Sequence, residues 1–293
     1  FIYNWSDYIA EDTIAAFEEE TGIDVTYDVY DSNEVLEAKL LAGSSGYDLV
    51  VPSSTFMARQ IQAGVFLPLD KSKLPNLANL APAMMEPVSA HAPDNAHGVI
   101  YMWGTTGLGI NVEAVTERLG EDFPRGWSLI LDPENAAKLA DCGITVLDSF
   151  SEVVGPMLNY VGADPASTDA ADFEAAGEAL AAIRPHIRYF HSSQYINDLA
   201  NGDVCVSVGW SGDVFIARDR AAEAENGVTV DYIIPEEGTI TWFDMMGIPS
   251  DAPHPQNAHL FLDYLMRPEV TAGITNYVWY ANANVPSLAM VDD

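Results

Sequence analysis

An aromatic ring and a carboxylate stand close together at three places in the sequence. The pairs are Trp5 with Asp7, Trp210 with Asp213, and Trp242 with Asp244. An aromatic face attracts a cation, and a carboxylate forms a charge-assisted hydrogen bond with an ammonium group. One such pair is explained equally well by a capped turn whose ring packs into the core. Three pairs favour a site for a cation that has an apolar stem.

These pairs lie at or near the ends of predicted strands. The opening strand, residues 1–3, runs into the first pair, and a helix with Ile14 and Phe17 on one face follows and ends at Gly22. Residues 25–29 alternate as a strand, and the apolar run at residues 47–51 stops at Pro52. This alternation of strand and helix predicts an α/β fold with a parallel sheet, in which ligands bind beyond the carboxyl ends of the strands.

The rest of the chain predicts a second α/β lobe. A glycine-broken apolar run covers residues 98–112, an alanine-rich helix residues 170–183, and a further helix residues 256–266. No repeat and no low-complexity linker separates the two parts. We therefore expect two lobes joined by more than one crossing of the chain.

The charge balance excludes whole classes of partner. The 293 residues include 44 Asp and Glu against 12 Lys and Arg, a formal net charge of -32. Nucleic-acid binding needs a basic footprint, so it is excluded. The acidic field would attract cations. The excess is too large for a few site residues to explain, which favours a solvated acidic surface suited to salty surroundings.

Other catalytic and targeting signals are missing from the sequence. The stretch GWSGD lacks the final glycine of a nucleophile elbow, and neither a phosphate loop, a calcium loop nor an H-E-x-x-H zinc motif occurs. No metal, cofactor or catalytic residue is therefore predicted. The chain also shows no basic segment followed by an apolar one at its start, so we expect a processed form without its signal peptide.

Two cysteines, Cys142 and Cys205, permit one disulfide in an oxidising compartment or two buried thiols. A bridge would close a loop of about 60 residues, which stabilises by roughly 4 kcal/mol in the chain-entropy model. Their number alone does not decide between these states.

Several stretches together resemble the periplasmic polyamine-binding proteins, the receptors of putrescine and spermidine ABC importers. The similarity runs from Phe1 to about Asn284 and is closest to the putrescine-binding branch and its spermidine-preferring relatives. The stretches are NWSDYI, DSNEVLEAKLLAG, YDLVVPS, IRYFHSSQYINDLANGD, GWSGDV and VWYANAN.

The resemblance implies a bilobal periplasmic-binding-protein fold of type II, with a central ligand cleft and several hinge crossings. Lobe 1 is expected at residues 1–103 and 219–267, and lobe 2 at residues 104–218 and 268–293. The family usually continues past the position of Asp293, so the C-terminal part of lobe 2 is expected to be truncated or diverged. The resemblance also implies that Cys142 and Cys205 are bridged.

The family's ligand residues carry over where the local motifs match. Carboxylates would hold the ammonium groups, rings would cover the methylenes between them, and serines would complete the hydrogen bonds. The implied set is Trp5, Ser6, Asp7, Tyr8, Ser53, Glu152, Ser192, Trp210, Asp213, Trp242, Asp244 and Tyr280.

The function that follows is capture of spermidine or putrescine in the periplasm and delivery to a membrane ABC permease by a monomeric receptor that is not an enzyme. Three alternatives stay open. The ligand could be another organic cation, such as agmatine or a quaternary amine. A chemoreceptor could read the loaded protein. A hydrolase could use paired carboxylates, although no motif supplies its nucleophile or base.

Trp242 stands where putrescine-type relatives tend to carry Phe, and its larger ring offers more surface to a longer methylene chain. We predict that Trp242→Phe lowers spermidine affinity more than putrescine affinity. Titration calorimetry with both amines on both proteins measures the difference, and equal losses would contradict it.

Overall fold

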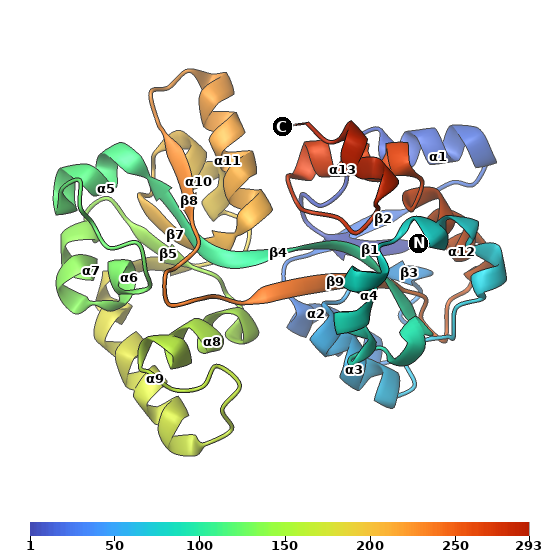
Figure 1. The fold of residues 1–293 in the computed structure, drawn as a ribbon, viewed down its shortest axis with the longest axis horizontal. Coiled ribbons are helices and arrows are strands. Elements are labelled where there is room, and N and C mark those ends of the chain that lie inside the picture. Colours follow the sequence, from blue (N-terminus) through green and yellow to red (C-terminus); the bar gives the residue numbers. More distant parts are fainter. Residues whose placement is uncertain (293) are drawn as a thin grey trace. The chain divides into compact units, whose positions relative to one another are not determined.

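The computed structural model describes residues 1–292, which divide into two compact units (Figure 1). Unit 1 comprises Phe1–Gly104 and the residues from Trp242 onward, and unit 2 comprises Thr105–Thr241. The chain therefore passes between the units after Gly104 and after Thr241. Two α/β units agree with the predicted fold class, but their boundaries differ from the expected ones.

The differences follow from continuous elements. The crossing expected near residues 217–220 would cut helix α11 (Ser211–Ala224), which packs on α10 (Tyr195–Asn201) and on β8 (Val230–Ile233) of unit 2. Residues 219–241 therefore belong to unit 2. The segment after Arg267 belongs to unit 1, because helix α13 (Pro268–Val278) packs on α12 (Pro255–Leu265) of that unit.

The sheet of unit 1 is parallel at its start and antiparallel later. Its strand order is β2 (Tyr27–Tyr30), β1 (Ile2–Trp5), β3 (Leu49–Val50), β9 (Thr241–Gly247) and β4 (Gly98–Asn111). Strand β1 pairs in parallel with β2 and β3, as the strand–helix alternation predicts. Strand β9 pairs with β3 in the antiparallel direction, which the sequence pattern does not indicate.

Helices surround these strands in Figure 1, and their ends follow ordinary capping rules. Ser32 caps α2 by accepting a hydrogen bond from the Val35 N–H, and Gly22 ends α1 with a φ of 70°. Asp12 is the N-cap of α1, so neither Ser6 nor Asp7 caps it. The other elements of unit 1 are α1 (Thr13–Thr21), α2 (Asn33–Leu41), α3 (Ser54–Gln62), α4 (Pro82–Ser89) and the short 3-10 helices η1 (Lys71–Lys73), η2 (Pro75–Asn79), η3 (Pro93–Asn95) and η5 (Pro286–Met290).

In unit 2, strand β4 lies between β8 and β7 (Val206–Trp210), followed by β5 (Ile144–Val146) and β6 (Ile187–Phe190). Strand β5 pairs in parallel with β6 and β7, and β4 is antiparallel to both of its neighbours. The remaining elements are α5 (Val112–Leu119), α6 (Ser128–Leu131), α7 (Pro133–Leu139), α8 (Phe150–Tyr160), α9 (Ala170–Ile183) and η4 (Arg184–His186).

Glycine explains how the long strand β4 packs. A Cβ at Gly109 would lie 2.8 Å from a methyl of Val214 and 2.9 Å from a methyl of Leu199. Both residues are fully buried on helices α11 and α10. The glycines that interrupt the apolar run at residues 98–112 therefore do not end the strand; Gly109 allows two helices to pack against it.

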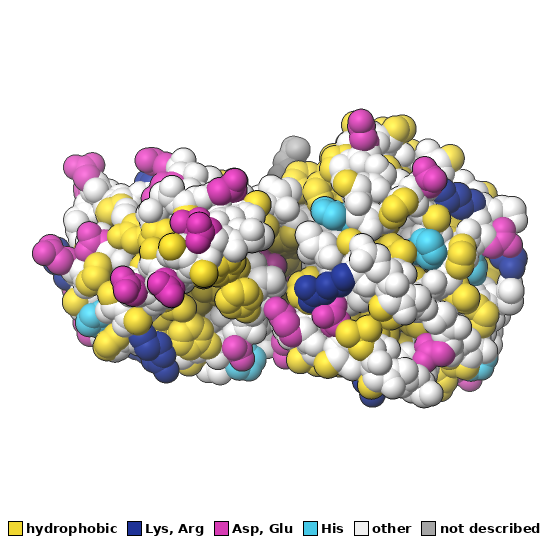
Figure 2. Space-filling model, turned by 90° about the horizontal axis from the view of Figure 1, so that it is seen from below, with side chains coloured by type: hydrophobic (Ala, Val, Ile, Leu, Met, Phe, Trp, Pro, Cys, Tyr) yellow, Lys and Arg dark blue, Asp and Glu magenta, His cyan; other side chains and the backbone are white. Residues whose placement is uncertain are grey.

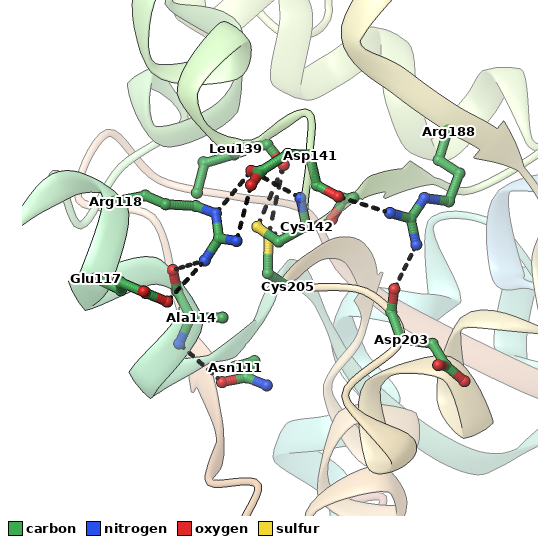
Figure 3. Close-up of a disulfide and its surroundings, with 11 residues drawn as sticks. Asn111, Ala114, Glu117, Arg118, Leu139, Asp141, Cys142, Arg188, Asp203 and Cys205 are labelled. Atoms are coloured by element: carbon green, nitrogen blue, oxygen red, sulfur yellow. Dashed lines mark hydrogen bonds and ion pairs between the residues drawn. A yellow bond between two sulfur atoms is a disulfide. The ribbon is translucent and has the colours of Figure 1, made fainter.

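The two cysteines form a disulfide that joins the loop before β5 to the start of β7 (Figure 3). This confirms the bridge that the resemblance implies. Arg118 donates two hydrogen bonds to the carboxylate of Asp141, the residue before Cys142, and these bonds hold the pKa of that carboxyl below its usual value. Arg188 donates to the backbone carbonyls of Asp141 and Asp203. Arg118 and Arg188 therefore both bind residues that lie next to the disulfide in the sequence.

The surface agrees with the acidic composition. Figure 2 shows acidic side chains spread over the visible face of each unit, with far fewer basic ones. Some of the ion pairs join two exposed side chains, such as Lys73 with Asp70, and these contribute little to stability. None of the helices within residues 1–292 combines the length and the hydropathy that a membrane crossing requires.

We predict that replacing both Cys142 and Cys205 with Ser lowers the free energy of unfolding by about 2–4 kcal/mol, because the bridge closes a 63-residue separation in the unfolded chain. Urea titration of the two proteins at equal pH measures the loss. An unchanged free energy of unfolding would contradict a stabilising role.

Candidate functional site

The carboxyl ends of β2, β1 and β3 meet at one edge of the sheet of unit 1, where ligand sites of α/β proteins form. Trp5 ends β1 there and is almost fully buried. Its indole N–H donates to the Val51 carbonyl at 2.8 Å, and its ring lies 4.8 Å from that of Tyr30. The N–H is used inside the protein, so Trp5 can offer a ligand its ring.

Asp244 is the centre of the polar contacts in unit 1. It lies on β9, only 4% exposed, opposite Ser53 in an isolated bridge. The Tyr8 hydroxyl donates to its Oδ2 at 2.9 Å, and the Ser53 hydroxyl donates to its Oδ1 at 2.6 Å. Ser53 is the N-cap of α3 but does not cap it with its side chain. Its hydroxyl serves the carboxylate instead.

Asn33 holds Ser53 in place through two hydrogen bonds. Its side-chain oxygen accepts from the Ser53 backbone N–H, and its amide donates to the Ser53 hydroxyl, both at 2.9 Å. Because Ser53 Oγ accepts this bond, its single hydrogen is directed to Asp244. No sequence motif points to Asn33; its burial and its partner follow from tertiary structure.

Three rings stand beside this carboxylate. The rings of Tyr8 and Tyr280 are 5.0 Å apart, and those of Trp242 and Tyr280 are 5.3 Å apart, both at steep angles. Such edge-to-face packing fixes the rings relative to one another. The structure thus brings five of the predicted residues into one connected set: Tyr8, Ser53, Trp242, Asp244 and Tyr280. Trp5 lies in the same unit, with its contacts to Val51 and Tyr30.

Ser6 and Asp7 lie apart from that polar centre. The Ser6 hydroxyl donates to Asp31 at 2.6 Å at an exposed position. Asp7 is exposed and adopts a φ of 51°, in the left-handed region. The turn after Trp5 therefore directs these two side chains to the surface of unit 1.

In unit 2 the carboxyl ends of β5, β6 and β7 likewise share an edge. Trp210 ends β7, and Asp213 follows in the first turn of α11, 5% exposed. The Tyr195 hydroxyl donates to Asp213 at 2.7 Å and accepts the Trp210 backbone N–H at 3.0 Å. One phenol therefore connects both predicted residues.

Glu152 reaches the same edge from α8, in the first turn of that helix. It is buried, and the Thr106 hydroxyl of β4 donates to it. Thr106 stands opposite Trp210 in the pairing of β4 with β7. Glu152, Trp210 and Asp213 are thereby connected in unit 2 through Thr106 and Tyr195, two residues that sequence reasoning missed.

Ser192 is buried in the loop after β6, and its hydroxyl accepts the Asp148 backbone N–H at 3.1 Å. This bond ties the loop after β6 to the loop after β5, which leads to the helix that carries Glu152. The structure therefore supports a structural role for Ser192, which holds these two loops together at the carboxyl ends of the strands.

Helix dipoles and tyrosines shape the electrostatics of both sets. Asp213 and Glu152 lie in first helical turns, where the helix dipole favours a negative charge. Burial, together with the charge of Asp213, raises the pKa of Tyr195 well above its usual value. Burial and the charge of Asp244 raise the pKa of Tyr30 in the same way. The phenols therefore stay protonated and neutral next to the site carboxylates.

Comparison with known proteins identifies the family of this chain. The family model of the bacterial extracellular solute-binding proteins matches residues 12–291. This chain belongs to that family.

The chain is 57% identical over 292 residues to the putrescine-binding periplasmic protein PotF of Escherichia coli, covering 99% of this chain and 79% of that protein. It is 50% identical to the putrescine-binding periplasmic protein SpuD of Pseudomonas aeruginosa, covering 100% of this chain and 80% of SpuD. A solved structure from Listeria monocytogenes, assigned to spermidine/putrescine ABC transport, superimposes with a TM-score of 0.88 at 32% identity and covers 99% of this chain and 85% of its own.

No group of three His, Cys, Asp or Glu side chains within residues 1–292 is arranged to hold a metal ion. The polar groups that meet at each edge are carboxylates with hydroxyl donors, beside aromatic faces. Such sets suit an organic ammonium group, which needs acceptors and a cation-binding ring.

The burial of three tyrosines predicts that the folded protein loses stability at high pH. Burial raises the folded-state pKa of Tyr30, Tyr101 and Tyr195 above the unfolded value of about 10. Their contribution to stability is complete below pH 10 and is lost above it, at up to about 1.4 kcal/mol per pH unit for each phenol. Urea titrations between pH 8 and 11, with absorbance of the phenolates at 295 nm, measure this. Ionisation of all tyrosines near pH 10 in the folded protein would contradict it.

Proposed function

We propose that this chain is a polyamine receptor of an ABC importer, acting in the periplasm. The observation that carries the proposal is that each unit holds a buried carboxylate that accepts a hydrogen bond from a phenol hydroxyl, and that this phenol is linked to a tryptophan, directly in unit 2 and through the Tyr280 ring in unit 1. Asp244 with Trp242 and Tyr8 forms the set in unit 1, and Asp213 with Trp210 forms the set in unit 2.

The chemistry of the sets matches an alkyl diamine. Its ammonium groups titrate near the lysine value of about 10, so both are charged at neutral pH. The hydrogen bonds described for Asp244 and Asp213 come from hydroxyls, which orient a carboxylate without neutralising it. An ammonium group can then donate charge-assisted hydrogen bonds to the remaining acceptor positions of either carboxylate.

The rings account for the apolar part of the ligand. A methylene chain can bury area against Trp242 and Tyr280 in unit 1 or against Trp210 in unit 2, and each ring that faces an ammonium adds roughly 0.5 to 2 kcal/mol. Glu152 in unit 2 adds a further carboxylate for a triamine or for a second hydrogen bond. We propose the same residues for the ligand as the sequence implies, with Ser6, Asp7 and Ser192 at the periphery.

The relatives support the class of ligand. PotF and SpuD are both named as putrescine-binding, and a further relative from Escherichia coli, 32% identical over 286 residues, is named as spermidine/putrescine-binding. All are binding proteins by name, so we propose capture and delivery to a membrane permease without turnover of the amine.

The proposal predicts that Asp244→Asn and Asp213→Asn each weaken putrescine binding by about 10- to 100-fold or more, since each removes a charge-assisted hydrogen bond. Titration calorimetry of the purified protein with putrescine, cadaverine, agmatine and spermidine measures the affinities and names the preferred amine.

Two matched variants control for loss of a hydrogen-bonded carboxylate elsewhere. Asp263→Asn in unit 1 alters a carboxylate that binds Asn76, and Asp198→Asn in unit 2 alters one that binds Tyr189. Both should bind putrescine as the unmodified protein does. Absence of heat with every amine would overturn the proposed function, as would equal losses in all four variants.

A further inference from the structure

Tyr195 opens helix α10 and is fully buried in unit 2, although no sequence motif assigns it a role. Its hydroxyl makes two hydrogen bonds at once, donating to Asp213 at 2.7 Å and accepting the Trp210 N–H at 3.0 Å. A phenol has one hydrogen, so the bond from Trp210 leaves that hydrogen for the carboxylate. The distance between the backbone of Trp210 and the carboxylate of Asp213 is therefore set through one side chain.

Gly209 makes room for this phenol. A Cβ at Gly209 would lie 2.5 Å from Tyr195 Cε2, 2.9 Å from Cζ and 3.1 Å from the hydroxyl oxygen. Tyr195 is enclosed on every side, so the ring could not move away without displacing its neighbours. Glycine at this position therefore allows the ring to lie this close to the end of β7.

We propose that Tyr195 is a positioning residue that holds Asp213 and Trp210 in the geometry that binds an amine, and that Gly209 is required for it to do so. This inference rests on the proposed function. It adds a determinant of affinity that touches no ligand itself. The raised pKa of Tyr195, caused by burial, keeps the donor protonated throughout the neutral range.

The first test is Tyr195→Phe, which keeps the ring and removes only the hydroxyl. Putrescine affinity should fall by about 10- to 100-fold, because the carboxylate loses a donor and the Trp210 N–H loses its acceptor. The matched control is Tyr189→Phe, which removes a 2.6 Å bond of the same kind to Asp198 in the same unit. That variant should bind putrescine unchanged. Full affinity in Tyr195→Phe would overturn the inference.

A double-mutant cycle separates positioning from a general structural effect. If Tyr195 acts through Asp213, Tyr195→Phe should cost much less affinity in an Asp213→Asn background than alone. Additive losses would show that the phenol serves the core and would overturn the inference.

The second test changes a different residue. Gly209→Ala should weaken putrescine binding, whereas Gly177→Ala, where a Cβ would meet no atom within 4 Å, should not. Thermal unfolding of each variant confirms that it is folded at the temperature of the titration. Equal affinity of both alanine variants would contradict the requirement for Gly209. Putrescine binding by the unmodified protein tests the proposed function separately, so failure of one proposal is distinguishable from failure of the other.

Discussion

The structure depends on keeping carboxylates charged after water has been removed from them. Asp244 and Asp213 are about 95% buried, and an isolated buried carboxylate is costly unless hydrogen bonds replace its hydration. The protein supplies these bonds from hydroxyls, Tyr8 and Ser53 on Asp244 and Tyr195 on Asp213. A hydroxyl satisfies the oxygen but brings no positive charge. A carboxylate has further acceptor positions that an ammonium group can fill, and for this reason we propose the same arrangement as a binding site.

The α/β architecture explains why these groups can be placed accurately. In both units several site residues follow neighbouring parallel strands at their carboxyl ends, where short loops lead into helices. Trp242 and Asp244 lie instead on β9, which is antiparallel to β3. A further group of residues then holds the site residues in place through hydrogen bonds. Asn33 orients Ser53, Thr106 binds Glu152, and Tyr195 joins Trp210 to Asp213. Held in this way, the acceptors lose little conformational entropy when a ligand binds.

The acidic surface and the disulfide support the candidate site without forming part of it. A net charge of -32 with few basic residues raises the local concentration of cations, and salt screens this effect. The bridge between Cys142 and Cys205 fastens the loop before β5 to the start of β7, the strand that ends at Trp210. It therefore stabilises the strands that present the site in unit 2.

The sequence by itself determined the class of chemistry and much of the local structure. Ring and carboxylate pairs and glycine stops are short-range signals, so the early strands and helices and the helix at residues 170–183 could be predicted directly, and the three ring and carboxylate pairs could be recognised. The full ligand set came from the resemblance to the polyamine-binding family and stays a prediction. The two units could also be expected from the alternation of strands and helices. The boundary between them could not, since it depends on α11 staying one helix and on α13 packing with α12.

Only the tertiary structure decided which residues hold the site in place. Asn33, Thr106 and Tyr195 have ordinary local contexts, and nothing in a linear pattern tells a buried tyrosine which carboxylate it will meet. Their partners are 20, 46 and 18 residues away, brought together by strand pairing and helix packing. Local propensity acts over a few residues, whereas the direction of a hydrogen bond to a buried carboxylate depends on where several separate elements finally pack.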